Sequence, residues 1–220
     1  MHRPDFQTQI LIGICATVWV VCAIAPLDLE AWMLEQFASA CGLIFLAWSI
    51  KRKIRFSLGA KASIAVLFIA HTIGTHFTYS LTPYDATFAA LSGISINDLF
   101  GFERNHYDRF VHLLYGLCLA EPTTHLLRQL FSLSRPACRM LSFHIIISTS
   151  ALYELVEWIA ALLFGGDLGA MYLGTQGDVW DAQIDIALAG LGFVMVYIAD
   201  AVIQKSRTLI NTTSRLLNNR

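Results

Sequence analysis

Residues 184–203 read IDIALAGLGFVMVYIADAVI, a stretch of 20 residues in which the only charged side chains are Asp185 and Asp200. About 20 consecutive apolar residues in a helix match the ~30 Å hydrocarbon core of a lipid bilayer. The whole chain has the same character, because 56% of its 220 residues are hydrophobic, 14% are charged and its mean hydropathy is +0.58. A soluble globular domain carries about 25% charged residues. The composition therefore predicts a membrane protein that is surrounded by a lipid bilayer.

Five further apolar blocks precede this stretch, with lengths of 16 to 25 residues. They span residues 10–25, 33–50, 62–81, 110–127 and 140–164. Only a helix satisfies every backbone hydrogen-bonding group inside a single segment that crosses lipid, so we expect each block to be helical. We therefore predict an all-α polytopic membrane protein, in which a six-helix transmembrane bundle forms one transmembrane domain over residues 1–220.

The positively charged residues are distributed unevenly between the two sets of loops. Arg104 and Arg109 fall on one side of the predicted bilayer, and the other thirteen of the 15 Lys and Arg residues fall on the opposite side. Because cytoplasmic loops carry the excess of Lys and Arg, this pattern predicts that both termini are cytoplasmic. The thirteen residues are Arg3, Lys51, Arg52, Lys53, Arg55, Lys61, Arg128, Arg135, Arg139, Lys205, Arg207, Arg215 and Arg220.

The first apolar block ends in Ala23-Ile24-Ala25, which resembles a signal-peptide cleavage site. A block of 16 apolar residues is long for a secretory signal, and cleavage would leave Pro26 as the first mature residue. We therefore expect this first helix to be retained.

Ionisable residues inside the predicted spans indicate a polar site. Glu154, Glu157 and Asp185 lie within spans, where a charge at the bilayer centre costs about 2.5–3.5 kcal/mol even on a lenient scale. Asp108 and His112 are four residues apart, and Glu154 and Glu157 are three apart. At either spacing the two side chains share one face of a helix.

The start of the last span and the end of the third span extend this site. Asp178, Asp181 and Asp185 form one stripe if the last helix starts early. On the third span His76 lies on a polar stripe, whereas His71 points about 140° away from it, so we favour His76. The predicted topology brings these groups to a similar depth in the outer leaflet. We therefore predict a single catalytic cluster that contains His76, Asp108, His112, Glu154, Glu157, Asp181 and Asp185.

Each of these features also has a purely structural interpretation. Asp108 and His112 could form an interfacial salt bridge, and the two glutamates could be protonated groups that join helices. The acids at the start of the last span could belong to a solvated helix N-terminus, where negative charge is favoured. The convergence of four helices at one depth favours a functional site over these alternatives.

Two chemistries suit such a site. A divalent metal could bind through nitrogen and oxygen ligands and activate water for hydrolysis or transfer. Without a metal, Asp108 and His112 would act as a base and a glutamic acid as the proton donor. Arg104 or Arg109 could receive an anionic headgroup as substrate-binding residues. The candidate metal ligands are His76, His112, Glu157 and Asp185.

Two long outer loops flank the predicted cluster. Residues 82–107 contain regularly spaced apolar residues and could form a short amphipathic helix on the membrane surface. Residues 165–181 contain five glycines, which permit close backbone approach and positive φ. Long loops of this kind are often functional.

Three segments of the sequence resemble those of a known family. YDRFVHLLYG (107–116), YELVEW (153–158) and GTQGDVWDAQID (174–185) are similar to the YjdF-like family of uncharacterised bacterial inner-membrane proteins. The resemblance extends over essentially the whole chain. It implies a multi-pass protein of the bacterial inner membrane and carries no established activity.

A weaker resemblance is to VanZ-like membrane proteins, whose pattern is Asp-Lys-x-x-His, Glu-x-x-Gln and Asp-x-x-x-Asn-x-x-Gly. Arg109, Glu157 and Ala189 depart from this pattern. The matching residues are Asp108, His112, Glu154, Asp185 and Gly192. VanZ-like proteins are associated with glycopeptide resistance at the cell envelope, and the resemblance implies no settled chemistry.

These observations support functions of different classes. The first is an enzyme that hydrolyses or modifies a lipid-linked or envelope small molecule from the outer leaflet. The alternatives are a proton- or ion-coupled carrier, because buried carboxylates and histidines can relay protons, and a non-catalytic membrane scaffold. Nucleic acid is excluded as a partner, because a net charge of −1 provides no basic field for phosphates.

Overall fold

The computed structural model describes the backbone of residues 5–218 and the side chains of residues 5–208. Arg3 and Arg220 lie outside the described residues, and so does the side chain of Arg215. Within this part of the chain there are nine helices and no strand. The helices are α1 (Phe6–Ala23), α2 (Leu29–Lys51), α3 (Leu58–His76), α4 (Tyr84–Ser92), α5 (Ile96–Phe100), α6 (Tyr107–Leu130), α7 (Arg135–Phe164), α8 (Gly166–Leu173) and α9 (Asp181–Asn218).

Most of the long helices begin several residues before the apolar blocks because polar capping residues start them. Asp28 accepts the N–H of Ala31 at the start of α2, and Ser134 accepts the N–H of Ala137 at the start of α7. The third helix ends earlier than expected, at His76 rather than at Leu81. The residues that follow, Thr78 and Tyr79, have positive φ angles and turn the chain out of the helix.

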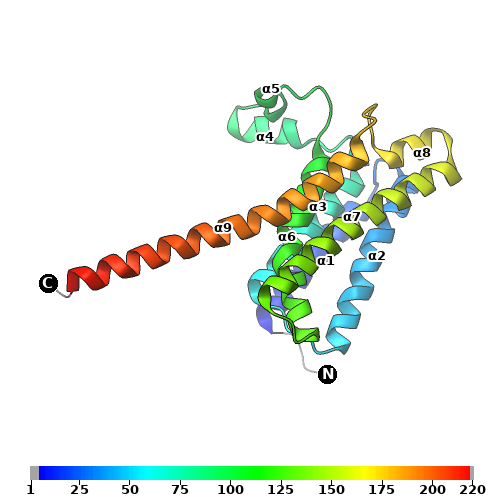
Figure 1. Ribbon diagram of the computed structural model, residues 1–220. Helices are drawn as coiled ribbons and strands as arrows, with labels where there is room; N and C mark the ends of the chain where they lie inside the picture. The colour runs from blue at the N-terminus through cyan, green and yellow to red at the C-terminus, as the bar shows by residue number, and fades with distance from the viewer. Residues whose placement is uncertain (1–4, 219–220) are drawn as a thin grey trace.

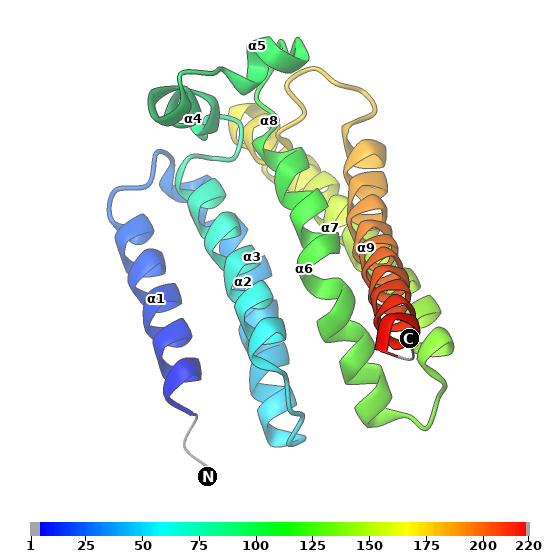
Figure 2. The same cartoon turned by 90° about the vertical axis from the view of Figure 1, so that its left-hand side faces the viewer.

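The long helices α1, α2, α3, α6, α7 and α9 lie side by side, and the short helices α4, α5 and α8 gather at one end of them (Figure 2). The C-terminal part of α9 projects beyond the other helices (Figure 1). Helix α6 is central, since it packs against α3, α7 and α9.

Among the described residues, five helices are long and apolar enough to cross a bilayer: α1, α2, α3, α7 and the segment Asp181–Thr208 of α9. Helix α6 has 24 residues but does not belong to this group. Polar residues such as His112, Glu121 and His125 lower its hydropathy. The expectation of an all-helical membrane protein is therefore confirmed, with five helices that meet the requirements for crossing rather than six.

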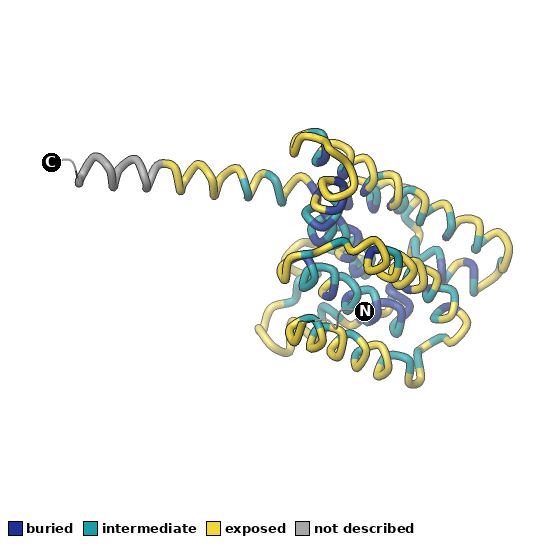
Figure 3. Tube along the Cα trace, turned by 90° about the horizontal axis from the view of Figure 1, so that it is seen from below, coloured by how far each residue is buried: buried dark blue, intermediate teal, exposed yellow. Residues whose placement is uncertain are grey.

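Small and polar residues make up much of the interior, beside larger buried ones such as Ile146 and Phe193, and many other large apolar residues are exposed. Figure 3 shows that buried and exposed positions alternate along the long helices. Leu43, Ile44, Leu162 and Leu163 are among the exposed large residues. The surface of a soluble monomer does not carry so much contiguous apolar area, but lipid-facing surface does. The buried hydroxyl-bearing residues of the long helices include Ser39, Ser49, Thr72, Thr75, Thr124, Ser142 and Ser150.

Helices α6 and α9 approach each other closely because both have glycine at their crossing. A Cβ atom on Gly116 would lie 1.9 Å from the carbonyl oxygen of Ala189, and one on Gly192 would lie 2.2 Å from that of Leu113. Small residues at such crossings let the backbones of two membrane helices touch. This contact fixes how α9 is oriented against α6, and with it the polar residues at the start of each helix.

The two loops predicted to flank the site contain short helices. Residues 82–107 form α4 and α5, two helices where a single amphipathic helix was predicted. Asp85 on α4 accepts hydrogen bonds from the N–H of Asn97 (2.9 Å) and from the hydroxyl of Ser95, and these contacts join α4 to α5. The same bonds, the backbone N–H foremost, lower the pKa of the Asp85 carboxyl. The glycine-rich loop forms α8.

Candidate functional site

A polar cluster lies where α6, α7 and α9 meet, at the same end of the molecule as α4, α5 and α8. The His112 ring is 8% exposed and lies at its centre. Its Nε2 atom is 3.3 Å from Glu154 Oε1 and 3.8 Å from Asp108 Oδ1, and its Nδ1 atom is 3.3 Å from the hydroxyl of Ser150. The Ser150 hydroxyl can donate to Nδ1, which leaves Nε2 facing the two carboxylates at ion-pair distances, while the Glu154 Oε1 atom has no hydrogen-bond partner among the described residues.

The same helical spacing brings these residues to the centre from three directions. Asp108 and His112 are four residues apart on α6, Ser150 and Glu154 on α7, and Asp181 and Asp185 on α9. Residues at this spacing lie above one another on one helix face. Each helix therefore presents one polar stripe to the other two.

Asp185 is the most deeply buried acid of the cluster, with 1% of its surface exposed. Its Oδ1 atom has no hydrogen-bond partner among the described residues. One oxygen of Asp185, one of Asp108 and a ring nitrogen of His112 all lie within 4.8 Å of one another. A carboxylate, an imidazole and a second carboxylate thus surround a common point.

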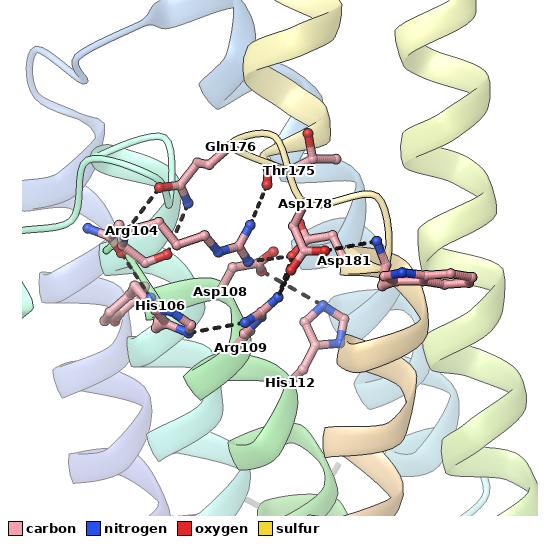
Figure 4. A network of polar contacts seen from close by, with 12 residues as sticks. Arg104, His106, Asp108, Arg109, His112, Thr175, Gln176, Asp178 and Asp181 are labelled. Carbon is pink, nitrogen blue, oxygen red and sulfur yellow. Dashed lines mark hydrogen bonds and ion pairs between the residues drawn. The ribbon is translucent and has the colours of Figure 1, made fainter. Parts of the chain in front are cut away.

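Two arginines lie between His112 and the loop that precedes α9 (Figure 4). Arg104 donates hydrogen bonds to the carbonyl oxygen of Thr175 and to Asp181. Arg109 forms an ion pair with Asp178 and contacts Asp181 at 3.4 Å. These contacts join residues 104–109 to the glycine-rich loop that precedes α9.

Amide groups reinforce this junction. The backbone N–H of Asn105 donates to Gln176 Oε1 at 3.0 Å, and Gln176 Nε2 donates to the carbonyl oxygen of Asn105 at 3.0 Å. Together with the arginines, this reciprocal pair holds the loop over the cluster.

The charges at this junction shift the pKa values of the groups beside it. The backbone N–H of Trp180, followed by the Arg109 guanidinium, lowers the pKa of the Asp178 carboxyl. Partial burial lowers the pKa of His106, and the charges of Arg109 and Arg104 lower it further. Asp178 is therefore ionised and His106 neutral at physiological pH.

A second group of buried acids adjoins the first. Glu157 is 6% exposed, and Glu154 lies close enough to share a hydrogen bond with it when one of the two carboxyls is protonated. Glu35 of α2 is 5% exposed and accepts a hydrogen bond of 2.7 Å from the hydroxyl of Tyr153. A fourth long helix therefore contributes an acid to the interior.

Glu35 is not among the predicted site residues, because it lies at the third residue of the 33–50 block, beside the loop that precedes it. Two signals could have identified it. Asp28 is a strong N-cap residue and extends the helix back to Leu29, which places Glu35 nearly two turns inside the helix. Ala31, Glu35 and Ser39 also form a buried stripe of small and polar residues at four-residue spacing.

The structure does not bring His76 to the cluster. Its Nδ1 atom is 2.8 Å from the carbonyl oxygen of Cys22, and its ring packs edge-on against Phe77. His76 therefore connects the end of α3 to α1. The predicted metal set of His76, His112, Glu157 and Asp185 is accordingly not assembled. His71, the histidine set aside in favour of His76, is partly buried, and its Nδ1 atom lies 2.5 Å from the hydroxyl of Tyr79.

The remaining predicted residues meet around His112. Asp108, Glu154 and Asp185 lie around its ring, Asp181 lies under the two arginines, and Glu157 adjoins Glu154. Arg104 and Arg109, predicted to bind an anionic substrate, are occupied by acids of this chain. The catalytic and substrate-binding roles of all these residues stay predictions.

Long apolar helices, exposed large apolar residues and a buried ionisable cluster define a multi-pass α-helical membrane protein. Residues 7–206 match the family described as "Predicted membrane protein (DUF2238)". The chain belongs to this family of membrane proteins.

A curated relative agrees with this assignment. The chain is 35% identical over 121 residues to "Inner membrane protein YjdF" of Escherichia coli (strain K12). The matched segment covers 54% of this chain and 54% of the relative, so the chain spans about half the length of the relative it matches. The YjdF-like resemblance is thus confirmed, whereas the VanZ-like resemblance finds no support. No solved structure matches the chain.

Proposed function

We propose that this protein crosses the bacterial inner membrane six times, with both termini in the cytoplasm. The packing of α6 against α3, α7 and α9 supports a sixth crossing, because a helix surrounded by transmembrane helices need not be strongly apolar itself. The thirteen-to-two distribution of Lys and Arg supports the orientation. The name of the relative supports the inner membrane. In this orientation the polar cluster lies in the outer leaflet.

The cluster is the site of an enzyme that hydrolyses or transfers a group of an anionic, lipid-linked envelope substrate. The observation that carries this proposal is the position of His112 between Asp108 and Glu154 at 3.8 and 3.3 Å. An imidazole flanked by carboxylates is a proton-transfer arrangement, in which one acid orients the ring and stabilises its protonated form. Asp108 or Glu154 can fill that role.

The arginines supply the recognition of negative charge. Arg104 and Arg109 are the only Lys or Arg residues predicted on the outer side, and both guanidinium groups lie at the outer edge of the cluster (Figure 4). A phosphate on the substrate would replace Asp178 or Asp181 as their partner, since guanidinium binds phosphate and carboxylate through similar bidentate hydrogen bonds. The substrate would then lie directly above His112.

An open surface groove of about 660 Å³ beside Arg104 offers space for a headgroup. It is lined by Arg104 together with polar residues that include Thr82, Tyr84, Asn97 and Gln176. Arg104 lines this groove and is also paired with Asp181 of the cluster, so a headgroup held there would contact a residue that borders the cluster. The carrier alternative has less support, because Glu121 and Asp200 near the inner end are paired with Arg135 and Arg139.

The test compares the polar lipids of cells that lack the protein with those of cells that express it. Mass spectrometry should detect an anionic lipid-linked species whose amount changes with the wild-type chain. His112→Ala should reduce the turnover of this species about 10²–10⁴-fold, the usual contribution of a general acid or base. His76→Ala is the matched control, because it removes a histidine that lies outside the cluster. Identical lipid profiles with and without the protein, or full turnover by His112→Ala, would contradict the proposal.

A further inference from the structure

The acids around His112 outnumber the cations that could neutralise them. Arg104 and Arg109 pair with Asp181 and Asp178. Within the described part of the chain, no Lys or Arg forms an ion pair with the remaining acids of the site. Those acids are Glu35, Asp108, Glu154, Glu157 and Asp185. Buried carboxylates require a proton, a pairing cation or a metal to offset their loss of hydration.

Three of the side chains have the geometry of a metal site. The ligand atoms of Asp108, His112 and Asp185 lie within 4.8 Å of one another. In a tetrahedral site with metal–ligand bonds of about 2.1 Å, two ligand atoms are about 3.4 Å apart. The 3.8 Å between His112 Nε2 and Asp108 Oδ1 is already near this value. The other pairs of ligand atoms lie within 4.8 Å, so each would have to close by at most about 1.4 Å to reach the tetrahedral spacing.

Asp185 provides an independent observation. It is 1% exposed, and its Oδ1 atom has no hydrogen-bond partner among the described residues. An unpartnered carboxylate oxygen in a protein interior is costly. The His112 ring nitrogen belongs to the same group of ligand atoms as the Asp185 carboxylate. A cation that binds both oxygen and nitrogen would therefore give the Asp185 oxygen a partner.

We propose that Asp108, His112 and Asp185 bind one divalent transition-metal ion, of the Zn²⁺ or Mn²⁺ type. A histidine ligand favours these ions over Mg²⁺ and Ca²⁺, which prefer oxygen alone. Three protein ligands leave a coordination position for water, as in catalytic metal sites. Glu154 Oε1 lies 3.3 Å from the same Nε2 atom and is therefore placed beside the ion to accept a proton from bound water, while the Ser150 hydroxyl faces Nδ1, the other ring nitrogen, and would orient the ligand. This inference rests on the function proposed above and names the ion that its site uses.

The experiment uses the full-length chain purified in detergent, treated with a chelator and then titrated with Mn²⁺ or Zn²⁺. Elemental analysis after removal of free metal should find a single ion per wild-type chain. Asp185→Asn preserves the shape of the side chain and should weaken metal binding at least about 100-fold. Mutation of residues that only hydrogen-bond to a metal ligand already lowers metal affinity about 10–100-fold. Asp98→Asn, at an exposed carboxylate on α5, and His76→Ala should bind as the wild type does.

Thermal unfolding gives a second measurement, which shows whether a variant without metal is still folded. Metal should raise the thermal unfolding midpoint of the wild-type chain, because binding to the folded state alone stabilises it. The midpoint of Asp185→Asn should not respond to metal. Pulsed EPR of Mn²⁺-loaded wild type should also detect a coordinated histidine nitrogen, without the need for any variant.

The outcomes separate this inference from the proposed function. A wild-type chain that retains neither Mn²⁺ nor Zn²⁺ would overturn the metal site, and so would unchanged binding by a folded Asp185→Asn. In that case a lipid change that depends on His112 would leave the enzyme proposal intact in its metal-free form. Metal binding in the absence of any lipid change would support the site and contradict the enzyme.

Discussion

At the scale of single residues, the site is held together by charged and polar side chains that contact residues on neighbouring helices. His112 contacts Asp108 on its own helix and Ser150 and Glu154 on α7. Arg109 connects α6 to the loop before α9 through Asp178. In a membrane interior such contacts replace the water that would otherwise solvate each group. One residue therefore affects the position of several helices.

The Arg109–Asp178 pair leads to a prediction about pH. The pKa of Asp178 is lowered in the folded protein, so the folded state binds fewer protons than the unfolded state, whose Asp pKa is about 3.9. The stabilisation is complete above that unfolded value and is lost as the pH falls through the lowered folded value. Asp178→Asn should therefore lower the thermal unfolding midpoint at pH 7 and have a diminishing effect in acid.

Thermal unfolding of the purified chain across a series of pH values measures this difference. Asp98→Asn serves as the control, since it changes the same residue type on the exposed side of α5. A midpoint difference between wild type and Asp178→Asn that stays constant into strong acid would contradict the assignment of the pair.

At the scale of helices, α6 combines low hydropathy with a central position. It is the helix that supplies Asp108 and His112, and it contacts α3, α7 and α9. Its Thr124 hydroxyl lies 3.0 Å from that of Ser142 on α7 and 2.6 Å from that of Tyr197 on α9. Hydrogen bonds of this kind join helices in membranes in addition to their apolar packing. The helices around α6 thus provide partners for its polar residues.

The crossing of α6 and α9 gives a prediction about packing. Gly116→Ala or Gly192→Ala should destabilise the protein by at least about 2–3 kcal/mol, because the new methyl group would overlap a backbone carbonyl that cannot move independently. The same changes should displace Asp185 relative to His112 and so weaken metal binding. Unfolding midpoints in detergent and the metal titration measure the two effects.

Gly13→Ala and Gly42→Ala are matched controls in α1 and α2, since nothing lies within 4 Å of a Cβ at either position. Their midpoints should equal that of the wild type or rise slightly, because alanine favours a helix. Equal loss of stability in all four variants would indicate that close packing at the crossing is not the cause.

At the scale of the whole molecule, the two ends of the bundle differ in charge. The end with α4, α5 and α8 has the acidic cluster and its two arginines. At the other end the acids pair with basic residues, as Lys61 does with Asp5 at 2.9 Å and Arg139 with Asp200 at 2.6 Å. Lys61 and Arg139 are among the thirteen basic residues predicted to face the cytoplasm.

This asymmetry leads to a prediction about topology. A reporter that is active only in the periplasm should be active when inserted at Asp98 and inactive when fused after Arg220. An insertion at Ser132, in the exposed loop between α6 and α7, should also be inactive, because α6 returns the chain to the cytoplasm. Activity at Ser132 would mean that α6 does not cross, and activity after Arg220 would overturn the orientation.

The sequence by itself determined the class of protein, the long helices and the pairs of polar residues that share a helix face. These properties are local, because helical periodicity and apolar length depend only on residues close together in the chain. Together with the predicted topology, which places these pairs at a similar depth, they predicted that Asp108, His112, Glu154 and Asp185 would meet.

Only the tertiary structure decided which other residues join them. The rotation of each helix about its axis depends on contacts with distant helices, such as the one between Gly116 and Ala189. This rotation turns Glu35 toward Tyr153. His76 is excluded because α3 ends there, in a turn formed by two non-glycine residues with positive φ that no sequence pattern indicates. Contacts between residues far apart in the chain therefore determined the composition of the site.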